Sequence, residues 1–238
     1  LQLQAEHGYT LVHPFDDPKV IAGQGTIGLE ILEDMPDIDA VVVPIGGGGL
    51  IAGVAFAIKS LRPDVKVYGV QSAGAPSMVA SLQERKIQHL AEVSTIADGI
   101  AVKEPGVNTF DICNTYVDEV VTVTDDEIAA AILALLEQQK MVAEGAGAVS
   151  VAAVMFNRLP VAGKRVVCLV SGGNIDVSTL NRVIVRGLVK SGRNCTLTLD
   201  LFDKPGQLSG VCAVIARLGG NVISVSHERN NDSTEING

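Results

Sequence analysis

The sequence predicts an α/β fold built on a doubly wound, mostly parallel sheet. Short apolar runs alternate with longer segments of helical composition, which is the pattern of successive βα units. Residues 40–45 are continuously apolar, as in a strand that is buried on both faces. Aromatic residues make up only 3% of the 238-residue chain, so aliphatic side chains must build the core.

The elements of this fold follow in order along residues 1–190. Strands are expected over residues 40–45, 66–70, 119–123 and 165–170. Helices are expected over residues 50–61, 77–86 and 144–156, with another that Thr124 or Asp125 can cap. Glu127 stands where a capping box from Thr124 needs it. This helix should carry its apolar face on Ile128, Ile132, Leu135 and Leu136.

The pattern changes near residue 190, where residues 190–193 form a polar linker. Residues 196–201 alternate apolar and polar side chains, as a half-exposed strand does. A helix over residues 208–218 and a strand over residues 221–226 complete one βαβ unit. We therefore expect two domains, residues 1–190 and residues 194–238.

Composition and charge exclude several classes of function. Eighteen Lys and Arg against 27 Asp and Glu give a net charge of −9, which argues against a general nucleic-acid binder. Four cysteines without a CxxC pair indicate reduced thiols in a cytoplasmic protein. Residues 40–58 carry no charge, but four consecutive glycines would break a spanning helix, so we expect no membrane partner.

The strongest motif is a glycine loop between a strand and a helix, formed by Gly46, Gly47, Gly48, Gly49 and Leu50. Successive glycines let backbone N–H groups converge, and the helix that follows adds its positive dipole end. Together these features predict a phosphate site. A tight turn needs far fewer glycines. A dinucleotide fold expects an acidic residue at the end of the next strand, where this chain has Gln71.

Two further motifs carry polar side chains. Ser171 begins a Ser-Gly-Gly-Asn loop after an apolar strand, where its hydroxyl could face a ring nitrogen or cap a nearby helix. Glu144 enters a run of glycines and alanines. Tight helix packing explains the small residues of that run but not the carboxylate.

These motifs, together with residues 22–26 and Ala97-Asp98-Gly99, occur in a characteristic order. As a set they resemble the pyridoxal-phosphate enzymes of the tryptophan-synthase β-subunit fold, specifically the threonine ammonia-lyases and their relative serine racemase, over residues 1–188. Residues 199–222 resemble the start of an ACT domain, a ferredoxin-like module that often binds amino acids. The resemblance implies a partial fold-type II large domain followed by a partial ACT unit. It also implies pyridoxal 5'-phosphate, an amino-acid substrate, a possible amino-acid effector, and a dimer or tetramer.

The resemblance also implies roles for individual residues. The backbone of the glycine loop would hold the cofactor phosphate, and Gly99 and Glu144 would line the cofactor pocket. Ser171 would face the pyridine nitrogen, where a neutral hydroxyl does not favour full protonation of the ring and suits direct β-elimination. The implied reaction converts L-threonine, or serine, to a 2-oxo acid and ammonia; for threonine the product is 2-oxobutanoate.

The chain departs from the family in one respect. None of its nine lysines stands in the family's Ser-x-Lys-x-Arg-Gly context, and neither Lys19 nor Lys59 has a matching neighbourhood. We therefore expect that the Schiff-base lysine lies outside this chain, that the chain is truncated at both ends, and that alone it is inactive. Gln71 and Ser77 stand where serine racemase has metal-binding carboxylates, so no metal is expected. Serine racemase, serine dehydratase and a non-catalytic amino-acid-sensing fragment remain alternatives.

Overall fold

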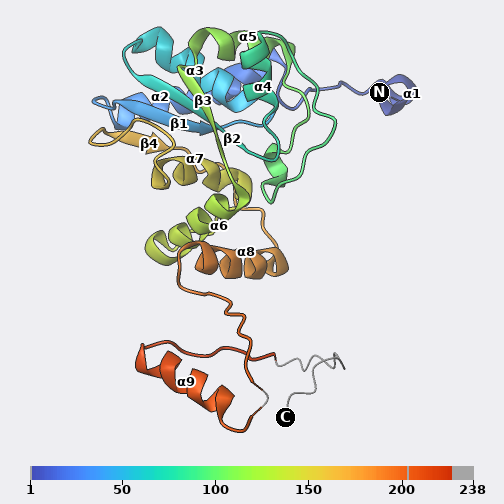
Figure 1. Ribbon diagram of the computed structural model, residues 1–238. Helices are drawn as coiled ribbons and strands as arrows, with labels where there is room; N and C mark the ends of the chain where they lie inside the picture. Colours follow the sequence, from blue (N-terminus) through green and yellow to red (C-terminus); the bar gives the residue numbers. More distant parts are fainter. Residues whose placement is uncertain (1, 203, 227–238) are drawn as a thin grey trace. The chain divides into compact units, whose positions relative to one another are not determined.

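A computed structural model describes residues 2–202 and 204–226, and it separates into two compact units, Leu1–Cys195 and Thr196–Gly238 (Figure 1). The strands of the first unit are β1 (Ala40–Pro44), β2 (Lys66–Ser72), β3 (Glu119–Val123) and β4 (Val166–Cys168). They form a sheet in the order β3-β2-β1-β4, and every pairing is parallel. The predicted parallel α/β fold is therefore confirmed, although β4 ends two residues earlier than expected.

Helices cover both faces of the sheet (Figure 1). One face carries α2 (Pro18–Asp34), α3 (Gly49–Leu61), α4 (Ser77–Glu84) and α5 (Val107–Tyr116). On the other face α7 (Gly145–Met155) lies against the sheet, α6 (Asp125–Ala134) packs against α7, and α8 (Val177–Lys190) packs against α6. Shorter elements of the first unit include α1 (Gln2–His7) and the 3-10 turn η1 (Asp98–Ile100). No helix in the described ranges is long and apolar enough to cross a membrane.

The central strand β1 is completely buried. It pairs with β2 on one edge and with β4 on the other. Its side chains alternate between the two cores, since Ala40 and Val42 belong to one and Val41 and Val43 to the other. A strand that is paired on both edges and packed on both faces must be apolar throughout, which explains its uninterrupted apolar run.

The start of α6 confirms the predicted capping box. The Thr124 hydroxyl accepts a hydrogen bond from the Glu127 N–H at 3.3 Å, and the Glu127 carboxylate accepts one from the Thr124 N–H at 2.8 Å. The second carboxylate oxygen of Glu127 accepts a hydrogen bond from Arg158 at 2.5 Å. Burial raises the pKa of Glu127, but these hydrogen bonds lower it by more, so that pKa lies below its ordinary value.

The end of α6 differs from the sequence expectation. The α-helix ends at Ala134, and the chain continues as a π-helical turn, Leu135–Gln139. Leu135 is buried in the same core cluster as Ile128 and Ile132, as expected, whereas Leu136 is only partly buried and lies outside that cluster. Lys140 then adopts a left-handed conformation (φ 58°), which ends the helical segment four residues before Glu144.

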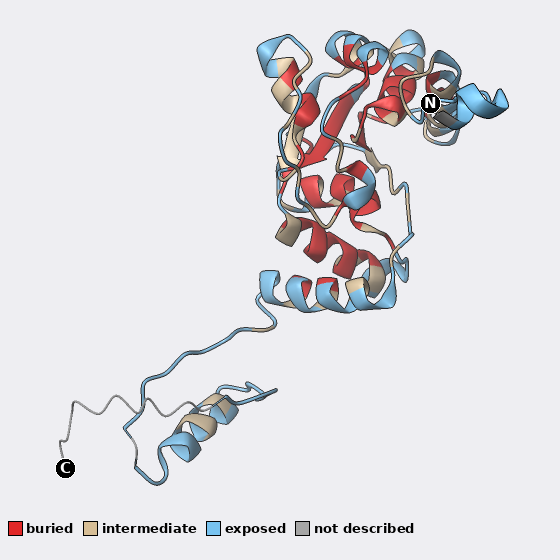
Figure 2. Cartoon of the chain, turned by 90° about the vertical axis from the view of Figure 1, so that its right-hand side faces the viewer, coloured by how far each residue is buried: buried red, intermediate tan, exposed pale blue. Residues whose placement is uncertain are grey.

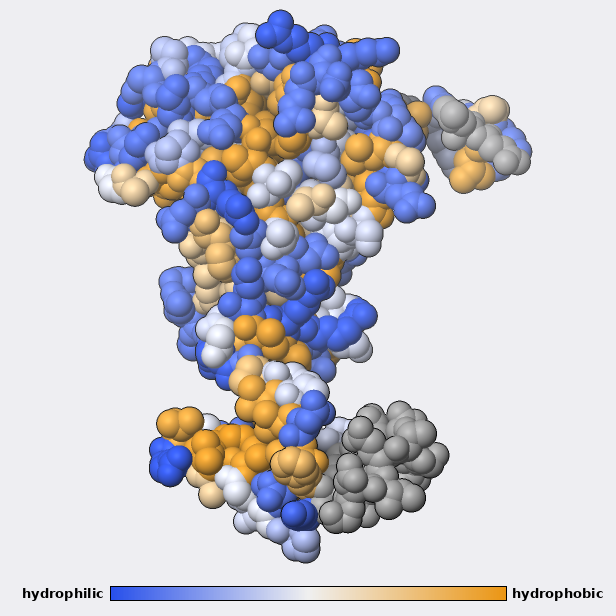
Figure 3. All heavy atoms as spheres, viewed as in Figure 1, coloured by the Kyte–Doolittle hydropathy of each residue, from blue (hydrophilic) through white to orange (hydrophobic). Residues whose placement is uncertain are grey.

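The second unit contains α9 (Gln207–Arg217), which agrees with the helix expected over residues 208–218. The strands expected over residues 196–201 and 221–226 do not form, since neither segment pairs with another in the described ranges. Helix α9 buries none of its residues (Figure 2), and apolar side chains gather on the surface of this unit (Figure 3). Leu208, Leu218 and Ile223 are exposed. One helix and two strands offer too little apolar surface to keep a two-stranded sheet together. Residues 227–238 of the expected second domain lie outside the described residues.

We predict that Glu127→Gln destabilises the protein at neutral pH by about 2 kcal/mol, because the amide must turn a donor toward either Arg158 or the Thr124 N–H. A carboxyl whose pKa is lowered by folding stabilises the fold above its ordinary pKa and stops doing so as the pH falls through the lowered value. The difference in the free energy of unfolding between wild type and Glu127→Gln should therefore shrink below about pH 4.3. Urea unfolding at pH 7 and pH 3.5 measures it.

The matched control is Glu137→Gln, because Glu137 pairs with Arg193 at 2.7 Å on the surface. Its effect should be much smaller at either pH. An equal loss of stability in both variants would contradict this role for the Glu127 carboxylate. So would a Glu127→Gln effect that does not change with pH.

Candidate cofactor site

The candidate site lies where the strand order of the sheet reverses. From β1 the chain continues to β2 and β3 on one side, and β4 then returns to the opposite edge of β1. In open α/β sheets, ligands bind at the carboxyl ends of the strands beside such a reversal. The glycine loop follows β1 and the Ser171 loop follows β4. These strands are adjacent and parallel, so both predicted motifs lie at the carboxyl ends of the strands.

The glycine loop leaves its backbone donors free. Among the described residues, the N–H groups of residues 46–50 donate no hydrogen bond to the protein. Gly48 stands at the N-cap of α3 with φ 99°, a conformation that side chains strongly disfavour. Free N–H groups at the positive end of a 13-residue helix fit a phosphate group.

Packing also requires some of these glycines. A Cβ at Gly47 would overlap the ring of Phe15, and a Cβ at Gly49 would lie 2.9 Å from the Phe15 backbone. A Cβ at Gly46 would lie 3.2 Å from the Ile100 Cα, beside Gly99. The loop is therefore held between the Phe15 segment and the Gly99 segment. Sequence reasoning did not identify Phe15, because nothing in its neighbourhood shows that it meets a loop more than thirty residues later.

Glu144 lies between two other predicted site segments. A Cβ at Gly172 would overlap the Glu144 carboxylate, and a Cβ at Gly99 would lie 3.7 Å from Glu144 Oε1. The Glu144 N–H donates a hydrogen bond to the Gly172 carbonyl at 3.0 Å. The structure thus brings Gly99, Glu144 and the Ser171 loop together. The half-buried carboxylate accepts no hydrogen bond from the described part of the chain, so it remains available to a ligand.

Ser171 is exposed, and its hydroxyl makes no hydrogen bond to any described residue. It does not cap the next helix, because the Asp176 carboxylate does so by accepting hydrogen bonds from the Ser178 and Thr179 N–H groups, both at 2.9 Å. The alternative interpretation, that the Ser171 hydroxyl caps a nearby helix, is therefore wrong.

Gln71 has a structural task. Its side chain is fully buried, and Oε1 accepts hydrogen bonds from the Met78 N–H at 2.9 Å and the Val79 N–H at 3.0 Å. These bonds satisfy free donors at the start of α4. The described residues contain no group of three His, Cys, Asp or Glu side chains that could hold a metal.

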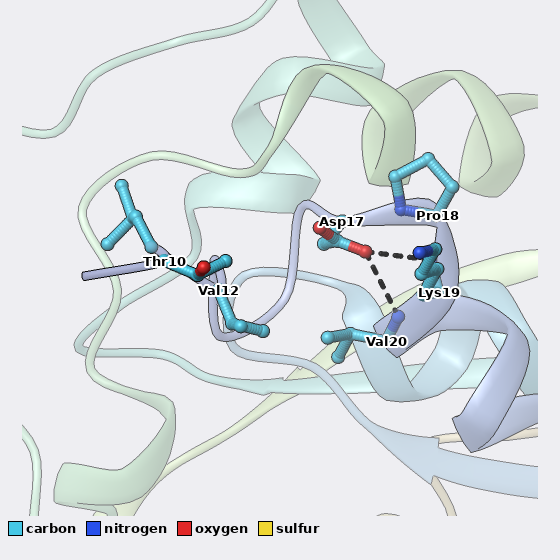
Figure 4. A pocket seen from close by; sticks show the side chains of 7 residues that line it. Thr10, Val12, Asp17, Pro18, Lys19 and Val20 are labelled. Atoms are coloured by element: carbon cyan, nitrogen blue, oxygen red, sulfur yellow. Dashed lines mark hydrogen bonds between the residues drawn. The ribbon is translucent and has the colours of Figure 1, made fainter. Parts of the chain in front are cut away.

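Lys59 lies away from the candidate site. Its ammonium pairs with Asp118 at 2.7 Å, and Asp118 immediately precedes β3, at the amino end of the sheet. Burial raises the pKa of Asp118, but hydrogen bonds from Lys59 and Lys66 lower it below its ordinary value. Lys19 lines a hollow of 470 Å³ formed by residues 10–12 and 17–20, where Asp17 caps α2 through the Lys19 and Val20 N–H groups (Figure 4). No predicted site residue lines that hollow.

Comparison with known proteins assigns the chain to a family. The model of the pyridoxal-phosphate dependent enzyme family matches residues 1–172. The L-threonine ammonia-lyase of Thermotoga maritima is 57% identical over 96% of this chain, and the same-named protein of Geobacter sulfurreducens is 51% identical over 99%. The chain spans 57% and 59% of the lengths of these two relatives.

Solved structures agree with the sequence relatives. Processed threonine deaminase isoform 2 from Solanum lycopersicum superposes with a TM-score of 0.73 at 41% identity, covering 78% of this chain and 55% of that one. Serine racemase from Dictyostelium discoideum gives a TM-score of 0.69 at 39% identity, covering 74% of this chain and 57% of that one. The family model, the sequence relatives and the shared fold lead to one conclusion: this chain belongs to the pyridoxal-phosphate dependent enzyme family.

Proposed function

We propose that the protein is a pyridoxal-phosphate-dependent threonine ammonia-lyase, which converts L-threonine to 2-oxobutanoate and ammonia. The observation that carries the proposal is the meeting, at the strand-order reversal, of backbone donors, a carboxylate and a hydroxyl that make no hydrogen bond to the described residues. The names of the two sequence relatives support threonine as the substrate.

Each site residue then has a definite task. The N–H groups of residues 46–50 bind the cofactor phosphate, and the Ser171 hydroxyl faces the ring nitrogen. Gly99 lets the ring approach its loop closely, and Glu144 presents a hydrogen-bond acceptor to the pocket. When bound, pyridoxal phosphate supplies an electron sink that makes the substrate Cα proton removable. A lysine outside this chain anchors the cofactor covalently.

Other features of the protein are also proposals. We propose that it works in the cytoplasm as a dimer or tetramer, without nucleic-acid or membrane partners. The unit that contains α9 is proposed to belong to an ACT-like domain, residues 194–238, that binds an amino-acid effector.

We predict that the holoenzyme has a kcat/KM for L-threonine about tenfold above that for L-serine, because a pocket that fits the additional methyl group gains its transfer free energy. Measuring 2-oxobutanoate and pyruvate release with each amino acid tests this. Conversion of L-serine to D-serine without matching 2-oxo acid release would instead identify a serine racemase.

For the 238-residue chain alone, we predict no 2-oxobutanoate release in the presence of pyridoxal phosphate, because it lacks the covalent anchor. Lys19→Ala and Lys59→Ala should leave the absorption spectrum of the cofactor mixture unchanged. Loss of an imine absorption band on either substitution would show that the anchor lies within this chain.

We predict that Gly48→Ala weakens pyridoxal-phosphate binding by about tenfold, because the new Cβ must occupy a left-handed conformation within 2.8 Å of the Thr109 Cβ. Gly163→Ala is the matched control: Gly163 also has a positive φ (73°), but nothing lies within 4 Å of its added Cβ. The control should lose some stability and keep its cofactor affinity. If a spectroscopic titration gave both variants the same affinity for pyridoxal phosphate, the glycine loop would not be part of the cofactor site.

A further inference from the structure

A buried hydroxyl lies directly behind the glycine loop. The Thr109 side chain in α5 is fully buried, and its Oγ1 donates a hydrogen bond to the Gly47 carbonyl at 2.6 Å. The Gly106 carbonyl lies farther from the same oxygen, at 3.1 Å. A hydroxyl has a single proton, so the shorter contact, which joins residues 62 positions apart, is the stronger bond.

This bond sets the orientation of a peptide group in the glycine loop, residues 46–50, which is the proposed phosphate cradle. The Gly47 carbonyl and the Gly48 N–H belong to one planar trans peptide, so they point in opposite directions. Because Thr109 and the Gly106 N–H, at 3.2 Å, both hold the carbonyl toward the start of α5, the Gly48 N–H must point away from α5. That N–H is one of the free donors of the loop.

The position of Thr109 is itself fixed from another part of the chain. The Asp16 carboxylate accepts hydrogen bonds from the N–H groups of Val107, Asn108 and Thr109 at 3.0, 2.9 and 3.3 Å. Asp16 follows Phe15, whose ring and backbone contact the glycine loop. One segment therefore holds both the loop and the first turn of the helix that carries Thr109.

We propose that Thr109 is a positioning residue for the cofactor phosphate, and that its hydroxyl aims the Gly48 N–H at the phosphate by holding the Gly47 carbonyl. This inference rests on the proposed function, because it takes the glycine loop to be the phosphate cradle. The loop is rich in glycine and its peptide groups can rotate, so binding to the phosphate depends on an external contact that keeps them aligned.

A purely structural role for the hydroxyl predicts a different result. If Thr109 only satisfies a buried carbonyl, its loss lowers stability and weakens every cofactor form equally. If it aims a phosphate donor, its loss weakens pyridoxal phosphate more than pyridoxal, which has the same ring and no phosphate. The ratio of the two affinities separates these roles.

The test compares Thr109→Val with wild type in the holoenzyme after removal of the cofactor. Valine keeps the shape of the side chain and removes the hydroxyl. We expect the ratio of pyridoxal-phosphate to pyridoxal affinity to fall about tenfold, the effect of one hydrogen bond that acts on a charged group. Thr109→Ser should restore the ratio, and the ³¹P resonance of the bound cofactor should shift in Thr109→Val only.

Thr115→Val is the matched control, because Thr115 lies on the same helix and its hydroxyl bonds to the Asp111 carbonyl at 2.8 Å, away from the loop. This variant should keep the wild-type ratio. An unchanged ratio in Thr109→Val would overturn the inference. If that variant does not fold, Thr109→Cys, with a weak thiol donor, must lower the ratio relative to Thr109→Ser, or the inference fails. A wild-type protein that binds both compounds equally would instead refute the proposed phosphate cradle.

Discussion

Parallel pairing of β1 on both of its edges is the constraint on which the rest of the structure depends. A strand in that position is shielded from water on all sides, so it must be apolar and needs helices on both faces of the sheet. The same pairing puts the carboxyl end of β1 beside that of β4, where the strand order reverses. The candidate site is a consequence of this topology, since the glycine loop and the Ser171 loop continue from these two strands.

The glycine loop shows how packing and ligand binding can require the same residue type. Gly47 and Gly49 admit Phe15 on one side, while Gly48 adopts a backbone conformation that favours glycine. Contacts behind the loop, including the Thr109 hydrogen bond, hold its peptide groups in place, and the N–H groups of the loop donate to no residue that the structure describes. An anion can then bind without a cationic side chain, because the donors are already oriented and the helix dipole favours negative charge.

Sequence periodicity predicted the four strands and helices α3, α4, α6 and α7 of the first unit, because these elements belong to a repeating βα pattern. Helices α2, α5 and α8 were not predicted. The capping box of Thr124 and Glu127 is local, and the sequence predicted it, with Asp125 as the alternative cap that the structure does not use. The π turn after Ala134 was missed, because an α-helical apolar pattern does not reveal an added residue in a turn. The strands expected over residues 196–201 and 221–226 had the right alternation, but alternation alone provides no neighbouring strand to pair with.

The sequence by itself determined the fold class and the family, because the order of the strands and the spacing of the glycine motifs can be read directly from the order of the residues. It also identified the residues that converge on the candidate site, through Gly99, Glu144 and the loops after β1 and β4. Only the tertiary structure decided what surrounds them: Phe15 behind the glycine loop, Asp16 at the start of α5, and the Thr109 hydroxyl on the Gly47 carbonyl. These contacts join residues separated by 32 to 93 positions. Folding selects such pairs by shape and by the need to satisfy buried polar groups, and neither leaves a periodic signal in the sequence.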